Sequence, residues 1–378
     1  MKKNLLLFAL FAIFAFIAVA CNQTEPNRTP GNTPAPDSTP SPTTTDGQPP
    51  EGGLTYVEET HLANIKQLTF GGENAEAYWS GDGKQLILQS THGDYKCDQI
   101  FTVNVEDSKE MKLVSTGKGR TTCSYFFPDG KKIIFASTHA AKADCPPPPD
   151  FSQGYVWPIN PDYDIYVANP DGSDLKTLAK SSGYDAEATI SPDGKKIVFT
   201  STRDGDLDLY IMDADGSNVK RLTDDPGYDG GAFFSPDGKQ LVYRAYHPTG
   251  DELTQYQDLL KKNLVKPSKM EIFIMNADGS EKRQLTTIGK ANFCPFFTPD
   301  GQRVIFSSNH ADLDPKARNF DLFVVSAEDG TNMKRITYSP GFDGFPMFSP
   351  DGKKLVWASN RNAKARGETN VFVADWVE

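Results

Sequence analysis

The sequence predicts an all-β protein, a six-bladed β-propeller with four-stranded antiparallel blades. One observation behind this prediction is a motif that occurs six times: an apolar strand, a turn such as Ser-Pro-Asp-Gly-Lys, and a second apolar strand. Another is the spacing of the copies, since successive turn aspartates lie 47, 64, 44, 63 and 51 residues apart. Repeats of this length that contain only strand patterns are typical of propellers. The turn aspartates are Asp82, Asp129, Asp193, Asp237, Asp300 and Asp351.

The third copy shows the four strands of one blade. Residues 184–191 form the first strand, and the Pro-Asp-Gly sequence that follows supplies the backbone angles of a tight turn. Residues 195–202 are rich in β-branched and aromatic side chains, as expected of a second strand. Residues 206–213 and 218–224 complete the blade around a second turn, Asp-Gly-Ser.

The two ends of the repeat region indicate how the ring closes. The last copy has a third strand at 370–376, and the sequence ends at Glu378 before a fourth. Residues 65–69 match the pattern of a fourth strand, as at 220–223. We therefore expect the N-terminal segment to complete the last blade, which removes the exposed sheet edges.

The first twenty residues resemble a bacterial lipoprotein signal sequence. Two lysines precede an apolar run over 5–19, which is shorter than the about 20 residues of a membrane-spanning helix. Small residues directly before Cys21 imply cleavage there and attachment of lipid to the Cys21 sulfur. Ordinary secretory cleavage and an uncleaved anchor are the alternatives, and all three export the domain.

The rest of the chain divides into a tether and the propeller. Residues 21–53 include eight of the 27 prolines and few apolar side chains, so we expect a disordered tether there and the propeller over 54–378. The formal net charge of −11 disfavours nucleic acid and anionic lipid surfaces as partners. We expect a monomer that is held to a membrane by lipid on Cys21, faces the periplasm or the cell surface, and has an envelope protein or peptide as its partner.

The six motif copies, together with the shared last blade, resemble TolB-like propeller repeats over nearly all of residues 61–378. The resemblance implies the fold, whereas a fold by itself implies no particular chemistry. TolB also has an N-terminal α/β domain that contributes to its contacts, where this chain has the tether.

We expect the working face at the end of the propeller that carries the connections between second and third strands and between blades. The turns at the other end are short and alike. The long connections are 140–162, with four consecutive prolines, and 248–269. Within the latter, 251–264 has apolar residues at helical spacing and is interpreted as a lid on the propeller rim. Long loops at one end of a rigid scaffold are common binding sites.

Four of the five histidines share one position of the repeat, ten residues after the turn aspartate, and the other two copies have arginine there. We call these six residues the His/Arg set and expect them around the mouth of the central channel. They are His92, His139, Arg203, His247, His310 and Arg361.

The first strands begin at the same end of the molecule. Eight residues before the turn aspartates lie Asn74, Thr121, Asp185, Asp229, Asn292 and Asp343. Six residues before them lie Glu76, Cys123, Glu187, Gly231, Cys294 and Phe345. The acidic members Glu76, Glu187, Asp185, Asp229 and Asp343 are candidate ligand-binding residues together with the His/Arg set. A structural alternative is that the His/Arg set caps loops or pairs with aspartates of neighbouring blades, and that the aspartates bind backbone amides.

These residues favour a binding or scaffold module that recognises a protein, a peptide or a small anionic ligand. Arginine supports an anion because its guanidinium pairs with carboxylate or phosphate at two points. We assign no catalytic residue and no cofactor.

Two other functions stay open. The first is a metal-dependent enzyme, since oligogalacturonate lyases resemble TolB-like propellers and use histidines around a metal ion. In this chain His92, His139 and Glu76 could share a divalent ion. The second is an accessory propeller of a peptidase or Tol-like envelope system. The sequence has none of the motifs HExxH, GxSxG or CxxC, so hydrolase and zinc-protease functions lack support.

Export would place the cysteines in an oxidising compartment. Four cysteines remain after Cys21, which allows three pairings. Cys97 begins a third strand and Cys145 lies in the long loop of the neighbouring blade, at the same end of the propeller. This proximity favours a disulfide between Cys97 and Cys145.

Overall fold

A computed structural model of the chain describes residues 53–312 and 319–378. All of them belong to one compact unit, Asp46–Glu378. The expected signal sequence, the lipidated Cys21 and nearly all of the tether lie outside the described residues. No helix in the described part of the chain is long and apolar enough to cross a membrane.

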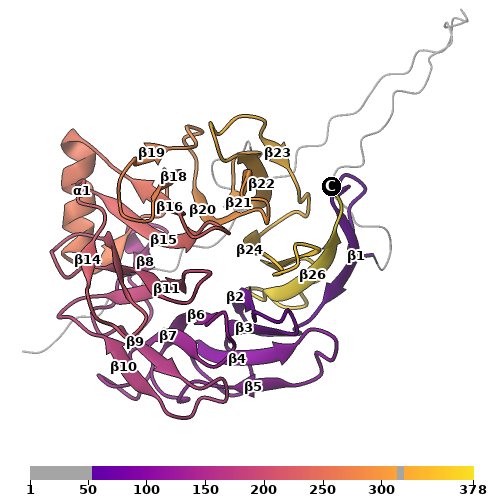
Figure 1. Ribbon diagram of the computed structural model, residues 1–378, viewed down its shortest axis with the longest axis horizontal. Coiled ribbons are helices and arrows are strands. Elements are labelled where there is room, and N and C mark those ends of the chain that lie inside the picture. Colours follow the sequence, from indigo (N-terminus) through magenta and orange to yellow (C-terminus); the bar gives the residue numbers. More distant parts are fainter. Residues whose placement is uncertain (1–52, 313–318) are drawn as a thin grey trace, which may run out of the picture. The chain divides into compact units, whose positions relative to one another are not determined.

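Six four-stranded antiparallel sheets form a ring (Figure 1), which confirms the predicted six-bladed propeller. The first three blades, written from the inner strand outward, are β2 (Asn74–Trp79), β3 (Gln85–Ser90), β4 (Gln99–Asn104) and β5 (Met111–Leu113); β6 (Thr121–Phe126), β7 (Ile133–Ser137), β9 (Asp164–Ala168) and β10 (Lys176–Ala179); and β11 (Asp185–Ile190), β12 (Lys196–Ser201), β13 (Asp208–Asp213) and β14 (Lys220–Arg221). The last three are β15 (Tyr228–Phe234), β16 (Gln240–Tyr246), β18 (Glu271–Asn276) and β19 (Arg283–Gln284); β20 (Asn292–Phe297), β21 (Arg303–Ser308), β22 (Asp321–Ser326) and β23 (Lys334–Arg335); and β24 (Asp343–Phe348), β25 (Lys354–Ser359), β26 (Asn370–Trp376) and β1 (Leu62–Gln67).

The ring closes as the sequence predicts. Strand β1 pairs antiparallel with β26, with Leu62 opposite Trp376 and Gln67 opposite Phe372. The backbone N–H of Leu68 continues the pairing by donating to the carbonyl of Val371 at 2.8 Å. The first and last strands of the propeller therefore share one blade.

The core lies between the blades and draws its largest side chains from the second strands. Trp357, Tyr243, Phe135, Phe199 and Phe306 occupy one position of the repeat and are each less than 2% exposed. In each of these five blades the residue lies opposite an aromatic side chain of the third strand. Such cross-strand aromatic pairs stabilise a sheet and also fill the space between blades.

The Asp-Gly turns touch one another around the ring. In five blades the turn glycine lies beside the turn proline of the preceding blade; a Cβ built on Gly194, for example, would be 3.8 Å from Cδ of Pro128. Blade one has Gly81 instead of proline. A Cβ at that position would be 2.2 Å from the carbonyl oxygen of Pro128, so no other residue fits there without a shift of the backbone.

The two long loops meet at the other end of the propeller. Strand β8 (Trp157–Pro158) from blade two pairs with β17 (Leu264–Val265) from blade four. The short 3-10 helix η1 (Phe151–Gln153) precedes β8. Cys97 and Cys145 form a disulfide, the pair favoured from the sequence, which ties the blade-two loop to blade one. We call the paired loops, residues 140–162 and 248–269, the loop bridge.

The helix expected in the blade-four loop is α1 (Gly250–Leu260). Its one buried side chain is Tyr256, whose hydroxyl donates to Asp206 at 2.6 Å and to the carbonyl of Gly227 at 2.7 Å. The helix is thus held on the rim, between the loops of blades three and four, and it supports one end of the loop bridge.

Candidate functional site

Every innermost strand has a β-bulge at the same place. In β2, for example, Ala75 lies opposite Gln89 but Tyr78 lies opposite Ile87, so β2 has one extra residue. The extra residue makes the side chains before and after it point to opposite faces of the sheet. The residue six positions before each turn aspartate has a φ between 52° and 58°, a left-handed conformation that is uncommon outside glycine. We call these six residues the bulge ring: Glu76, Cys123, Glu187, Gly231, Cys294 and Phe345.

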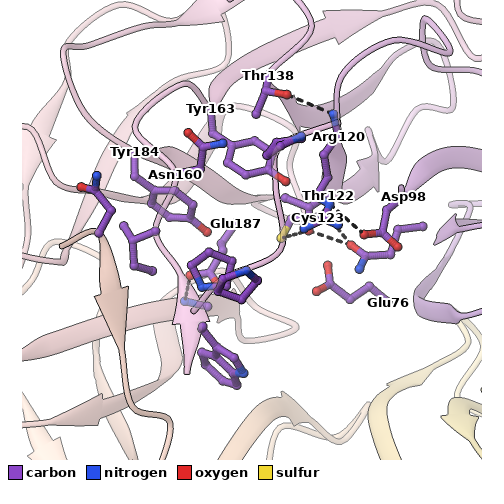
Figure 2. A pocket seen from close by; sticks show the side chains of 18 of the residues that line it. Glu76, Asp98, Arg120, Thr122, Cys123, Thr138, Asn160, Tyr163, Tyr184 and Glu187 are labelled. Atoms are coloured by element: carbon purple, nitrogen blue, oxygen red, sulfur yellow. Dashed lines mark hydrogen bonds and ion pairs between the residues drawn. The ribbon is translucent and has the colours of Figure 1, made fainter. Parts of the chain in front are cut away.

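All six members of the bulge ring line a cavity of about 840 Å³ at the loop end of the channel. Its outer wall is the loop bridge, including the four prolines 146–149 and Lys262 to Leu264. Figure 2 shows Glu76 and Glu187 reaching into the cavity with Cys123 between them, and Tyr163 and Tyr184 along one wall. The bulges therefore bring six residues from six blades, five of them with side chains, to the wall of one cavity.

Aromatic side chains close the channel below the cavity. The residues four positions before the turn aspartates include Tyr78, Tyr125, Phe233 and Phe296, and their rings contact one another with centroid distances from 5.3 to 6.2 Å. Burial raises the pKa of Tyr78 well above its ordinary value. This apolar floor makes the cavity a pocket with one open end.

The bulge ring is coupled in neighbouring pairs. In blades three and four, Glu187 accepts hydrogen bonds from the backbone N–H of Gly231 at 3.0 Å and from the Thr200 hydroxyl at 2.7 Å, and it pairs with the guanidinium of Arg244. The guanidinium occupies the place that a side chain at position 231 would fill, since a Cβ there would be 1.9 Å from Nη1 of Arg244. The charge of Glu187 is therefore fully compensated.

Glu76 has no comparable partner. The thiol of Cys123 is its hydrogen-bond partner, while its Oε2 atom is buried and has no partner among the described residues. Burial raises the pKa of Glu76 to about 7, and the charge of Glu187 adds to the effect, against the opposing influence of Cys123 and Arg244. Glu76 thus forms no ion pair among the described residues, and Arg244, which pairs with Glu187, acts on it only from a distance.

The rim beside Glu76 carries an acid–base pair of its own. Asp98 lies 3.5 Å from the Nε atom of Arg120. Burial raises the pKa of Asp98 in spite of the arginine. Arg120 thus forms an ion pair with Asp98 and is not among the groups that act on the Glu76 carboxyl.

The structure corrects the position expected for the His/Arg set: none of its six members lines the cavity. Each one packs instead on the third-strand aromatic residue of its own blade. The ring centroids of His139 and Tyr166 are 4.4 Å apart, and the guanidinium of Arg203 is 4.8 Å from the ring centroid of Tyr210. The remaining pairs are His92 with Phe101, His247 with Phe273, His310 with Phe323 and Arg361 with Phe372. Because the third strand is far from the axis, these side chains cap the blade faces.

The predicted positions of Asp185, Asp229 and Asp343 are corrected in the same way. Their side chains are fully buried outside the cavity. Each pairs with the His/Arg member of its own blade, not of a neighbouring one. The pairs are Asp185 with Arg203 at 2.9 Å, Asp229 with His247 at 3.1 Å and Asp343 with Arg361 at 3.3 Å. Of the eleven candidate ligand-binding residues, only Glu76 and Glu187 line the pocket.

The same contacts bear on the expected chemistry. Both arginines that suggested an anionic ligand already hold buried carboxylates. His92 and His139 do not converge on Glu76, since they pack against Phe101 and Tyr166. Among the described residues, no group of three or more His, Cys, Asp and Glu side chains is arranged to hold a metal ion.

Two of the cavity residues that sequence reasoning missed are Arg244 and Trp157. Arg244 stands alone as a charge in the apolar strand β16, and that isolation is a signal that could have identified it. Trp157 is the second of these residues. It lies in the loop bridge, 5.2 Å from the guanidinium of Arg244 and 6.0 Å from the ring of Phe293, so it spans the mouth between blades.

Comparison with known proteins identifies the family. The family model described as TolB beta propeller domain matches residues 158–263 and 266–375, together more than half of the chain. The chain belongs to this family.

Individual proteins named TolB match this chain over limited parts of its sequence. The Tol-Pal system protein TolB of Bordetella pertussis is 49% identical over 41 residues, 11% of this chain and 9% of that protein. A TolB homolog of Chlorobium luteolum is 29% identical over 28% of this chain and 31% of its own length. The chain thus matches less than a third of the length of these relatives. The crystal structure of TolB from Acinetobacter baumannii has the same fold, with a TM-score of 0.52 and 19% identity over 81% of this chain and 64% of that one.

Proposed function

We propose that this TolB-family propeller is an exported, envelope-associated binding protein, tethered to a membrane by lipid on Cys21, whose cavity receives a segment of another envelope protein. The observation that carries the proposal is the pocket itself. It is framed by the two longest loops of the chain, lined by aromatic and proline side chains, and closed at its base. Pockets of this kind, mostly apolar with a few placed polar groups, are typical binding sites.

The family supports a protein as the partner. The Bordetella relative is named as part of a Tol-Pal protein system. The loop bridge, which forms the outer wall of the pocket, also exposes large apolar side chains, since Phe151 is 54% exposed and Tyr155 is 57% exposed. Aromatic side chains at the edge of a pocket are typical of protein interfaces.

Site-specific photo-crosslinking in the native envelope tests this proposal. A photoreactive phenylalanine analogue replaces Tyr155 at the cavity rim or, as the matched control, exposed Lys195 on the Asp-Gly turn face. We expect a discrete protein adduct from position 155 and none of the same mass from position 195. Equal adducts from both positions, or none from position 155, would reject a cavity-directed partner.

The tether has a separate test. Cys21→Ser removes the sulfur that would carry lipid. We expect this variant to move from the membrane fraction to the soluble fraction or to remain unprocessed, and to lose labelling by radioactive palmitate. A membrane-bound variant with unchanged mobility would contradict lipid anchoring.

A further inference from the structure

The bulge ring contains a charge imbalance at one point. Glu187 is neutralised by Arg244, and the pair in blades five and six consists of a thiol and a phenylalanine, Cys294 and Phe345. Glu76 is paired only with a thiol. Among the six residues of the bulge ring, Glu76 is therefore the one acid without a cation.

The surroundings of Glu76 indicate that its partner is supplied by another molecule. Glu76 lines the cavity, and its Oε2 atom is buried and has no hydrogen-bond partner among the described residues. A buried acceptor that is left unsatisfied is destabilising, because it has lost its hydrogen bonds to water without gaining others. Its φ of 52° adds backbone strain that a glycine at this position would avoid. The positive φ is common to all six bulge residues, whereas the unsatisfied oxygen is found at Glu76 alone among them and indicates a ligand contact there.

The shape of the pocket selects the kind of cation. A metal ion needs several oxygen, nitrogen or sulfur ligands, and the described residues offer no group of three. A lysine or arginine side chain needs one carboxylate for its head and apolar walls for its methylene groups. Tyr78, Tyr184 and the prolines 146–149 supply such walls in the same cavity.

We propose that Glu76 is the anchor for a lysine or arginine side chain that a partner protein inserts into the cavity. This inference rests on the proposed function, in which the cavity is a protein-binding site, and it names the chemistry of the group that enters. The cation would restore the pairing that Arg244 provides for Glu187 on the other side of the ring.

The charged and titratable groups around Glu76 determine the pH range in which its carboxyl is ionised and can bind a cation. The thiol of Cys123 on β6, Glu187 on β11, Arg244 on β16 and Asp98 before β4 act on its carboxyl. Glu76 in turn acts on Tyr78 of its own strand, on Tyr163 directly before β9 and on Cys294 of β20. Since burial dominates and raises the pKa to about 7, the carboxyl is largely protonated at pH 5.5 and largely ionised at pH 8. A cationic ligand should therefore bind more tightly at the higher pH.

The probes are two acetylated pentapeptide amides, Gly-Gly-Lys-Gly-Gly and the same peptide with norleucine in place of lysine. Their dissociation constants are measured by NMR titration of the full mature chain in buffer with a chelator. We expect at least five-fold tighter binding of the lysine peptide at pH 8, a ratio near one for Glu76→Gln, and an unchanged ratio for the exposed control Glu110→Gln. Equal binding of both peptides to the wild type, or a preference that survives Glu76→Gln, would overturn the anchor.

A second measurement avoids substitution altogether. In the wild type, the preference for the lysine peptide should fall several-fold between pH 8 and pH 5.5, and a preference that is constant over this range contradicts the role of Glu76. The two proposals fail separately. An adduct from position 155 without any lysine preference rejects the anchor but keeps the protein-binding cavity. A lysine preference without an adduct rejects a protein as the partner but keeps Glu76 as a group that binds cationic side chains.

Discussion

A carboxyl group that is buried without full hydrogen bonding holds its proton more tightly in the folded protein than in the unfolded chain. Glu76 is such a group, with a pKa of about 7 against an ordinary value of 4.5. Because the folded pKa is raised, the stability that this proton contributes is fully present below about pH 4.5. That stability is lost as the pH rises through about 7.

Replacing Glu76 by glutamine should therefore stabilise the propeller at high pH only. Linkage between the two pKa values gives a gain on the order of 2 kcal/mol for the variant, relative to the wild type, on going from pH 5 to pH 8. Urea titrations of both proteins at the two pH values measure it. A difference between variant and wild type that does not change with pH would show that the carboxyl is not desolvated.

At the scale of the strand, the bulge joins neighbouring blades. In β15 the bulge residue is Gly231, and Arg244 of the adjacent strand fills the space above it to reach Glu187 of blade three. A side chain at position 231 would push Arg244 away and leave Glu187 buried without its cation. The absence of a side chain at Gly231 thus leaves room for the guanidinium that pairs with Glu187, the bulge residue of the preceding blade.

Gly231→Ala tests this arrangement against a matched control. Both Gly231 and Gly130 have positive φ, 58° and 68°, but a Cβ at Gly130 would meet nothing within 4 Å. We expect Gly130→Ala to show only the backbone penalty, about 1 kcal/mol. Gly231→Ala should lose several kcal/mol, because the Arg244–Glu187 pair breaks as well. Similar free energies of unfolding for the two variants would mean that Arg244 moves aside without loss.

At the scale of the whole molecule, the sequence predicted those features that a local motif marks in every repeat. The turn motif in six copies located the first and second strands, and the unmatched segment near Ile65 located the closing strand. The bulge could not be predicted in this way, because no residue type is common to its six positions, which share only their positive φ. The repeat also predicted the order of the His/Arg set around the ring, but it did not predict how far these side chains lie from the propeller axis. That distance depends on aromatic partners such as Tyr166 and Tyr210, which lie in another strand.

Closure of the ring depends on one buried ion network. Arg361 of blade six is 2% exposed at its side chain and pairs with Glu59, which precedes β1, at 2.8 Å, and with Asp343 at 3.3 Å. Glu59 also accepts a hydrogen bond from the backbone N–H of Tyr338, which follows the last strand of blade five, at 3.1 Å. The N-terminal segment and the last two blades therefore meet at the Arg361 guanidinium, and its loss leaves the two buried carboxylates, Glu59 and Asp343, without a cation.

Arg361→Ala should accordingly lower the free energy of unfolding by about 3–5 kcal/mol, the penalty of breaking a buried pair by removing one partner. The matched control is Arg366→Ala, five residues along the same loop and exposed, which should change it by less than about 0.5 kcal/mol. Adding Glu59→Gln to Arg361→Ala removes one of the two orphaned charges, so the double variant should be more stable than Arg361→Ala alone. If the double variant is instead less stable by the full amount of a second independent loss, Glu59 and Arg361 do not act together. The ring would then close through the β1–β26 pairing alone.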